Sequence, residues 1–144
     1  MGTHESTHLT TPAELSSLEP ATKFVRTAAL EAGMPGDEIG KIELALEEIF
    51  VNAALYAYPK GESGTIEISC ATRGPKGFIL EISDHGRSFD PLAASAPDLS
   101  AGLESRPVGG LGIFLVRSLA TSVSYRREEG RNRLILVFED CENH

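Results

Sequence analysis

The spacing of apolar residues predicts a long helix in the first half of the chain. Between residues 39 and 56 apolar side chains recur at intervals of three and four, which is the period of one helix face. Asp37 is predicted to cap this helix, which would run to about Tyr58. A second face carries Glu48 and Asn52, four residues apart and therefore pointing the same way. The predicted apolar stripe is Ile39, Ile42, Leu46, Ile49, Ala53 and Tyr56.

The chain before this helix is predicted to hold a polar segment and another helix. Residues 1–11 are polar, which is typical of a disordered segment or a short edge strand. A helix is then predicted from near Thr11, with Pro12 in its first turn, and Gly33 and Pro35 would end it. Its apolar stripe would be Leu15, Leu18, Thr22, Val25, Ala29 and Ala32.

After Gly64 the apolar period changes from helical spacing to alternation, which predicts strands. Two hairpins and one further helix follow, with a long loop of small residues at about 92–108 between them. Hairpins imply an antiparallel or mixed sheet, and the helices must cover one of its faces. We therefore expect an α+β fold, a two-layer sandwich with a mixed, mostly antiparallel sheet. The predicted strands are 65–71, 77–83, 121–127 and 133–139, and the predicted helix is 109–120.

Composition narrows the function classes without changing this picture. The 144 residues, 41% of them hydrophobic, fit one domain over 1–144 with its core at about 10–139. The net charge of −8 and the lack of a long basic run argue against nucleic-acid and anionic-membrane partners. No apolar run is long enough for a membrane span, and no secretory signal begins the chain, so we expect a cytoplasmic protein. Cys70 and Cys141 form no metal-binding motif and are interpreted as packing or bystander thiols.

Three stretches carry residues suited to chemistry, and each has a plainer interpretation. Asp84 follows a strand and precedes Gly86, so the pair could bind a ligand or simply form a turn. Gly109, Gly110 and Gly112 introduce a helix. Its free N–H groups and dipole suit phosphate, although a tight turn with close packing explains the glycines equally well.

The acid and amide of the long helix are the third stretch. An Asn52 side-chain oxygen is a hard ligand suited to Mg²⁺, and a Glu48 carboxylate one turn away could accept a proton from a hydroxyl. The plainer interpretation is that both side chains are solvated.

Taken in order, these stretches resemble the ATP-binding fold shared by gyrase-type topoisomerases, histidine kinases, mismatch-repair ATPases and the large heat-shock chaperone. The chain is most similar to the anti-sigma factor serine/threonine kinases of that superfamily, over roughly residues 10–139. The motifs that carry the resemblance are ELALEEIFVNAALYAYP (43–59), DHGRSFDP (84–91) and GGLGIFLVRSLA (109–120).

The resemblance implies a role for each candidate residue in binding ATP and Mg²⁺. Asn52 would hold Mg²⁺, and Asp84 would accept a hydrogen bond from the adenine amino group. Because guanine carries an oxygen at that position, a carboxylate there would favour ATP over GTP. Gly86 would pass close to the base. The phosphates would be bound by Gly110, Leu111 and Gly112, with Gly109 as a hinge.

The resemblance also implies the residues for phosphate transfer. Glu48 would be the general base toward a serine or threonine hydroxyl, and residues 92–108 would form a lid over the triphosphate. Arg106 would place a cation near the γ-phosphate. Glu47 is the alternative base, but it faces about 100° away from Glu48 on the helix and is better explained as a solvated charge.

Two main hypotheses of function follow from this resemblance. The first is a Mg²⁺-ATP-dependent serine/threonine protein kinase that acts as an anti-sigma factor. It would bind a sigma factor in one state and phosphorylate a small anti-sigma factor antagonist in the other, and its family commonly forms homodimers. The alternative is a nucleotide-gated protein-binding module with weak or no kinase activity. A third option is an ATPase-like domain of a signalling complex without a sigma factor.

Overall fold

The computed structural model describes residues 6–58, 64–74, 77–87 and 110–139. Their strands form a five-stranded sheet in the order β1-β2-β3-β5-β4, and every neighbouring pair is antiparallel. The elements in chain order are β1 (Ser6–Pro12), the short 3-10 helix η1 (Leu15–Ser17), α1 (Leu18–Glu31), α2 (Gly36–Tyr56), β2 (Thr65–Thr72), β3 (Gly77–Asp84), α3 (Gly110–Leu119), β4 (Ser122–Glu128) and β5 (Arg131–Glu139).

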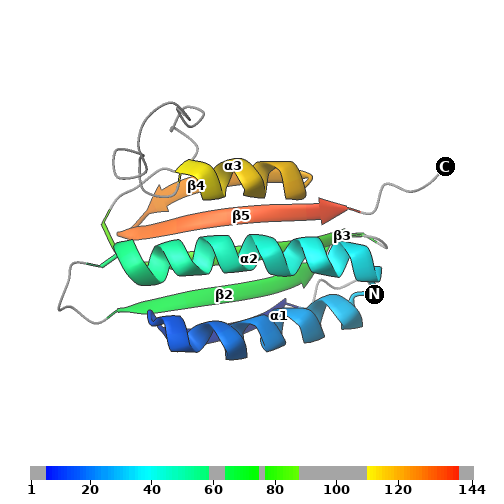
Figure 1. The fold of residues 1–144 in the computed structure, drawn as a ribbon, viewed down its shortest axis with the longest axis horizontal. Coiled ribbons are helices and arrows are strands. Elements are labelled where there is room, and N and C mark those ends of the chain that lie inside the picture. Colours follow the sequence, from blue (N-terminus) through cyan, green and yellow to red (C-terminus); the bar gives the residue numbers. More distant parts are fainter. Residues whose placement is uncertain (1–5, 59–63, 75–76, 88–109, 140–144) are drawn as a thin grey trace.

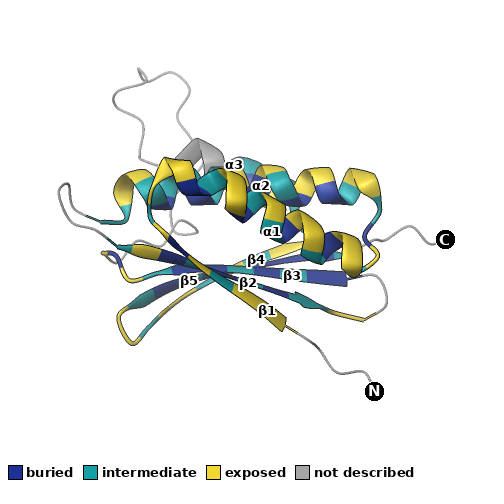
Figure 2. Cartoon of the chain, turned by 90° about the horizontal axis from the view of Figure 1, so that it is seen from below, coloured by how far each residue is buried: buried dark blue, intermediate teal, exposed yellow. Residues whose placement is uncertain are grey.

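The elements form two layers, with α1, α2 and α3 on one face of the sheet (Figure 1). Figure 2 shows buried residues between these layers and exposed residues on the outer sides of the helices. This arrangement confirms the predicted two-layer α+β fold. The described strands pair only in antiparallel fashion, so the expectation of a mixed sheet is wrong for this part of the chain.

The sheet core follows from the alternation seen in the sequence. Ile68 of β2, Ile82 of β3 and Leu134 of β5 lie side by side in register on the face toward the helices. The same face of these strands carries further buried residues, namely Ile66, Cys70, Phe78, Leu80, Leu136 and Phe138. The strands predicted at 65–71 and 77–83 are thus confirmed, each extended by one residue.

The beginning of the chain differs from the prediction. Pro12 is the last residue of β1, opposite Thr65, whereas we expected it in the first turn of a helix. An edge strand tolerates proline because only one side of it needs backbone donors. α1 therefore begins at Leu18, and Leu15 of the predicted stripe is 52% exposed. The side of α1 that packs on the core is formed by Ala21, Val25 and Ala29.

α2 lies across the centre of the sheet, between α1 and α3 (Figure 1). Most of its predicted stripe is buried, but Tyr56 is 42% exposed, and Phe50, outside that stripe, is fully buried. The helix ends at Tyr56 rather than Tyr58, and its N-cap is Pro35 rather than Asp37. Asp37 still lies in the first turn, where a carboxylate interacts favourably with the helix dipole.

The last hairpin is tighter than the sequence suggested. Glu129 and Gly130 both have positive φ angles, 50° and 76°, which fits a two-residue hairpin turn. β5 consequently begins at Arg131, two residues earlier than predicted, and Asn132 becomes part of the sheet. This register places Asn132 directly opposite Asp84 of β3.

Candidate functional site

Glu48 and Asn52 are half-buried on the flank of α2 that faces α3. The orientation follows from Glu43, which pairs with Arg26 of α1 and so marks the opposite flank. Asn52 is nine residues after Glu43, or half a turn of the helix beyond two full turns, and therefore points away from α1. Glu47 is exposed, which agrees with its interpretation as a solvated charge.

Figure 1 shows the N-terminal end of α3 beside the C-terminal end of α2. α3 begins at Gly110, one residue after the predicted start, so Gly110, Leu111 and Gly112 form its first turn. The first N–H groups of a helix have no partner within the helix, and the dipole adds positive potential there. The backbone of this turn thus has the donors that an anion would need, on the side of α2 that carries Asn52.

Asp84 ends β3 on the side of the sheet that faces the helices. Its Oδ1 atom accepts the N–H of Gly86 at 2.8 Å and the side-chain amide of Asn132 at 2.9 Å. Within the described residues, Oδ2 of Asp84 has no hydrogen-bond partner. One carboxylate oxygen is therefore held in place, and the other remains able to accept a ligand donor.

The residues after Asp84 are joined to the end of α2 by backbone contacts. The N–H of Arg87 donates to the carbonyl oxygen of Ala57 at 3.0 Å. Gly86 is buried against the same peptide, because a β-carbon on Gly86 would lie 2.1 Å from that oxygen. Gly86 is thus required for packing against α2, independently of any ligand that binds beside it.

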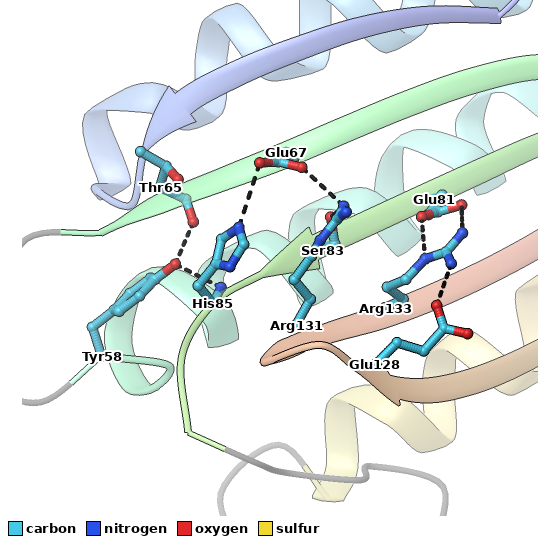
Figure 3. A network of polar contacts seen from close by, with 9 residues as sticks. All are labelled: Tyr58, Thr65, Glu67, Glu81, Ser83, His85, Glu128, Arg131 and Arg133. Atoms are coloured by element: carbon cyan, nitrogen blue, oxygen red, sulfur yellow. Dashed lines mark hydrogen bonds and ion pairs between the residues drawn. The ribbon is translucent and has the colours of Figure 1, made fainter.

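Tyr58 forms a second link at the same junction (Figure 3). Its hydroxyl donates to the carbonyl oxygen of Thr65 at 2.6 Å and accepts the N–H of His85 at 2.9 Å. One side chain thereby connects the end of α2, the start of β2 and the end of β3. Asn52 precedes Ala57 by five residues, about 7.5 Å along the helix axis, so the amide and Asp84 belong to the same end of the molecule.

A polar cluster surrounds Asn132, a residue that the sequence patterns did not single out. Its side-chain amide donates to Asp84 and to the carbonyl oxygen of Arg87, the latter at 2.8 Å. Its Oδ1 atom accepts the hydroxyl of Tyr125 and, at 3.1 Å, a guanidinium N–H of Arg127. The Glu129-Gly130 turn could have revealed this cluster from the sequence. If β5 is started directly after that turn, Asn132 falls within the strand and pairs with β3.

The opposite face of the sheet carries ion pairs (Figure 3). Arg133 donates to Glu81 at 2.7 and 3.0 Å and to Glu128 at 2.7 Å. These bonds raise the pKa of Arg133, the bonds to Glu81 most, and the bond that Arg133 donates to Glu128 lowers the pKa of Glu128. Arg131 similarly joins Glu67 to Ser83. The sheet separates these charges from Asp84, so they do not belong to the candidate site.

Several predicted residues lie outside the described part of the chain. These are Arg106, Gly109 and the predicted lid at 92–108. The structure joins the backbone beside Asp84 and Gly86 to the C-terminal end of α2, the helix that carries Glu48 and Asn52, and the start of α3 lies beside that end (Figure 1). In the described residues no cluster of three or more His, Cys, Asp or Glu side chains could hold a metal ion, and no helix there could cross a membrane.

Comparison with known proteins places these features in a family. The model of the histidine kinase-like ATPase domain family matches residues 11–138. The serine/threonine-protein kinase BtrW of Bordetella bronchiseptica is 31% identical over 97 residues, 67% of each chain. The serine-protein kinase RsbW of Listeria monocytogenes is 26% identical over 131 residues, 88% of this chain and 83% of that protein.

Solved structures support the same fold. The structure of the RsbU and RsbW domains of Rv1364c from Mycobacterium tuberculosis matches 94% of this chain with a TM-score of 0.67 at 18% identity. This chain spans 32% of that protein's length. The histidine kinase domain of a blue-light activated kinase from Erythrobacter litoralis matches 86% of this chain with a TM-score of 0.56 at 15% identity.

Proposed function

The chain belongs to the histidine kinase-like ATPase family, as its motifs indicated, and on this basis we propose that it is an ATP-dependent serine/threonine protein kinase acting as an anti-sigma factor. Its protein substrate would be a small anti-sigma factor antagonist. The observation that supports the proposal is the junction at which Ala57 and Tyr58, just after the Glu48–Asn52 helix, contact the backbone that follows Asp84.

Asp84 is the residue that would recognise the base. Its Oδ2 atom has no partner among the described residues and can accept a hydrogen bond from the amino group of adenine. Its Oδ1 atom already accepts hydrogen bonds from Gly86 and Asn132. Guanine presents a carbonyl oxygen at this position, which would face a carboxylate without a proton between them. This difference would give a preference for ATP over GTP.

Asn52 and the first turn of α3 would bind the phosphate end of the nucleotide. A half-buried amide oxygen fits Mg²⁺, which prefers oxygen ligands and is usually completed by phosphates and water. When bound, this ion would neutralise charge on the phosphates. The N–H groups of Gly110, Leu111 and Gly112 would donate to phosphate oxygens.

Glu48 would act as general base, one helical turn from Asn52. The substrate hydroxyl oxygen forms a bond to the γ-phosphorus, and the bond from that phosphorus to the β,γ-bridging oxygen breaks to release ADP. The hydroxyl proton passes to the Glu48 carboxylate. Arg106 would stabilise the charge on the transferred group.

Phosphate transfer tests this proposal directly. The purified chain would be incubated with radiolabelled ATP and the proteins that it captures from its native cell, and labelled serine or threonine would be identified. We expect the Glu48→Gln variant to transfer phosphate at least about 100-fold more slowly, because general-base catalysis contributes roughly that much or more. Glu47→Gln, an exposed neighbour on the same helix, is the matched control and should retain the wild-type rate.

The outcomes separate the two functional hypotheses. Equal rates for Glu48→Gln and wild type would remove Glu48 as the base. ATP binding without transfer to any captured protein would instead favour a nucleotide-gated protein-binding module. Base recognition is tested separately by Asp84→Asn, which should weaken ATP binding at least about tenfold, or 1.4 kcal/mol, and abolish the preference over GTP.

A further inference from the structure

Asn132 lies at the centre of a fully satisfied hydrogen-bond network beside Asp84. The residue is 9% exposed, and both of its amide hydrogens and both acceptor positions of its Oδ1 atom are used. Rotating the amide by 180° would bring its oxygen against the Asp84 carboxylate and its nitrogen against the Arg127 guanidinium. The orientation of Asn132 is therefore fixed by its neighbours.

This fixed amide determines how Asp84 is held. Two N–H groups, from Gly86 and from Asn132, point at the same carboxylate oxygen at 2.8 and 2.9 Å. They restrict rotation of the carboxylate and leave Oδ2 as the oxygen without a partner among the described residues. A carboxylate restrained in this way loses less conformational entropy when a ligand binds.

The same network holds the backbone that follows Asp84. Asn132 donates to the carbonyl oxygen of Arg87, and Arg127 donates to the carbonyl oxygen of Gly86 at 2.8 Å. β4 and β5 thus reach across to the turn after β3. Through these contacts Asn132 is linked to Asp84 and to the backbone that follows it.

We propose that Asn132 is a positioning residue for base recognition. By occupying Oδ1 of Asp84 and fixing the following turn, it keeps Oδ2 available for the amino group of adenine. The inference rests on the proposed role of Asp84 in binding ATP. A purely structural role would make Asn132 important for stability, with the same effect on every nucleotide.

A double-mutant cycle distinguishes these roles. Dissociation constants for ATP, GTP and purine riboside triphosphate, which lacks the amino group, would be measured by calorimetry for wild type, Asn132→Ala, Asp84→Asn and the double variant. We expect Asn132→Ala to weaken the binding of ATP at least about tenfold, or 1.4 kcal/mol, and the binding of the two other nucleotides much less. In the Asp84→Asn background the same substitution should change ATP binding less than about twofold.

Ser83→Ala is the matched control for loss of a buried polar contact. Ser83 is 2% exposed, is adjacent to Asp84 and accepts a hydrogen bond from Arg131 on the opposite face of the sheet. It should lower stability in urea without changing the order of nucleotide affinities. If Asn132→Ala does not fold, Tyr125→Phe takes its place, since it removes one donor to Asn132 and should reduce the same preference by a smaller factor.

The results also separate this inference from the proposed function. Equal weakening of all three nucleotides by Asn132→Ala, or an undiminished effect in the Asp84→Asn background, would overturn the positioning role. If Asp84→Asn itself leaves the ATP preference intact, the proposed recognition of adenine fails, and the inference fails with it. Loss of preference in Asp84→Asn but not in Asn132→Ala would leave the proposed function standing and reject only the inference.

Discussion

Replacing Gly86 with alanine should destabilise the protein in the absence of any nucleotide. The added β-carbon would lie 2.1 Å from the carbonyl oxygen of Ala57 and 2.6 Å from its carbonyl carbon. Both atoms belong to the backbone at the end of α2, and the N–H of Arg87 holds that oxygen at 3.0 Å. No side-chain rotation can relieve the overlap, so the two segments must move apart.

The size of the effect follows from this geometry. Real β-carbons essentially never approach closer than 3.0 Å, so the contact at 2.1 Å must lengthen by at least 0.9 Å, the difference between the two distances. Overpacking of this kind costs about 1–3 kcal/mol, and each weakened hydrogen bond at the junction adds about 0.5–1.5 kcal/mol. We expect a loss of about 2–4 kcal/mol, or roughly 6–15 °C in Tm.

Urea unfolding of the nucleotide-free protein, followed by circular dichroism, measures this loss. Gly40→Ala is the control, because Gly40 lies within α2 and a β-carbon there would meet nothing within 4 Å. That substitution should stabilise the protein by about 0.5–1 kcal/mol. If Gly86→Ala unfolds at the wild-type urea concentration but no longer binds ATP, the packing argument is refuted, and the glycine is needed for the ligand alone.

Three further predictions concern the rest of the fold. Leu46→Ala should lower the free energy of unfolding in urea by about 2–5 kcal/mol, because Leu46 is fully buried. Leu30→Ala should lower it by less than about 1 kcal/mol, because Leu30 is 60% exposed, and equal losses would contradict the observed packing. Burial raises the pKa of the Cys70 thiol to about 12 from 9.0, so the unfolded thiol ionises first and stability should fall between about pH 9 and 12. A Cys70→Val variant should lack this part of the pH dependence. If stability falls with pH in the same way in this variant and in the wild type, the role of Cys70 is refuted. The hydrogen bond from Arg133 lowers the pKa of Glu128 from 4.5, so the Glu128 carboxylate stabilises the fold above that pH, and this stabilisation is lost on acidification. Between pH 5 and 3, Glu128→Gln should therefore lose less stability in thermal unfolding than the wild type does.

The elements that the sequence predicted well are those with a strong local signal. α2, β2 and β3 each carry a regular apolar period and are bounded by turn residues, so their positions are correct to within about two residues. The start of α1 was misplaced because Pro12 suits both a helix start and an edge strand. Only pairing with β2, more than fifty residues later in the chain, decides between them.

The sequence singles out the residues of the candidate site but not how they are arranged. Asp84 and Gly86 stand out in the sequence, yet the sequence cannot show that Gly86 packs on Ala57. Asn132 was missed because its importance comes from the register of β3 and β5, which brings together residues 48 positions apart. A two-residue error at the start of β5 was enough to leave this contact out of the prediction.

If ATP binds at the proposed site, the contacts at the α2–β3 junction connect stability to nucleotide binding. The acid–amide pair and the carboxylate lie on different elements, and their relative position depends on backbone contacts of Arg87, Gly86 and His85 with the end of α2. A substitution that loosens this junction moves Asp84 relative to Asn52, so it should reduce stability and ATP affinity together. The ion pairs on the opposite face are partly exposed and do not contact the junction, with the exception of His85, which approaches Glu67 at 3.6 Å. Changes confined to Arg133 or Glu81 should therefore leave ATP affinity unchanged even where they alter stability.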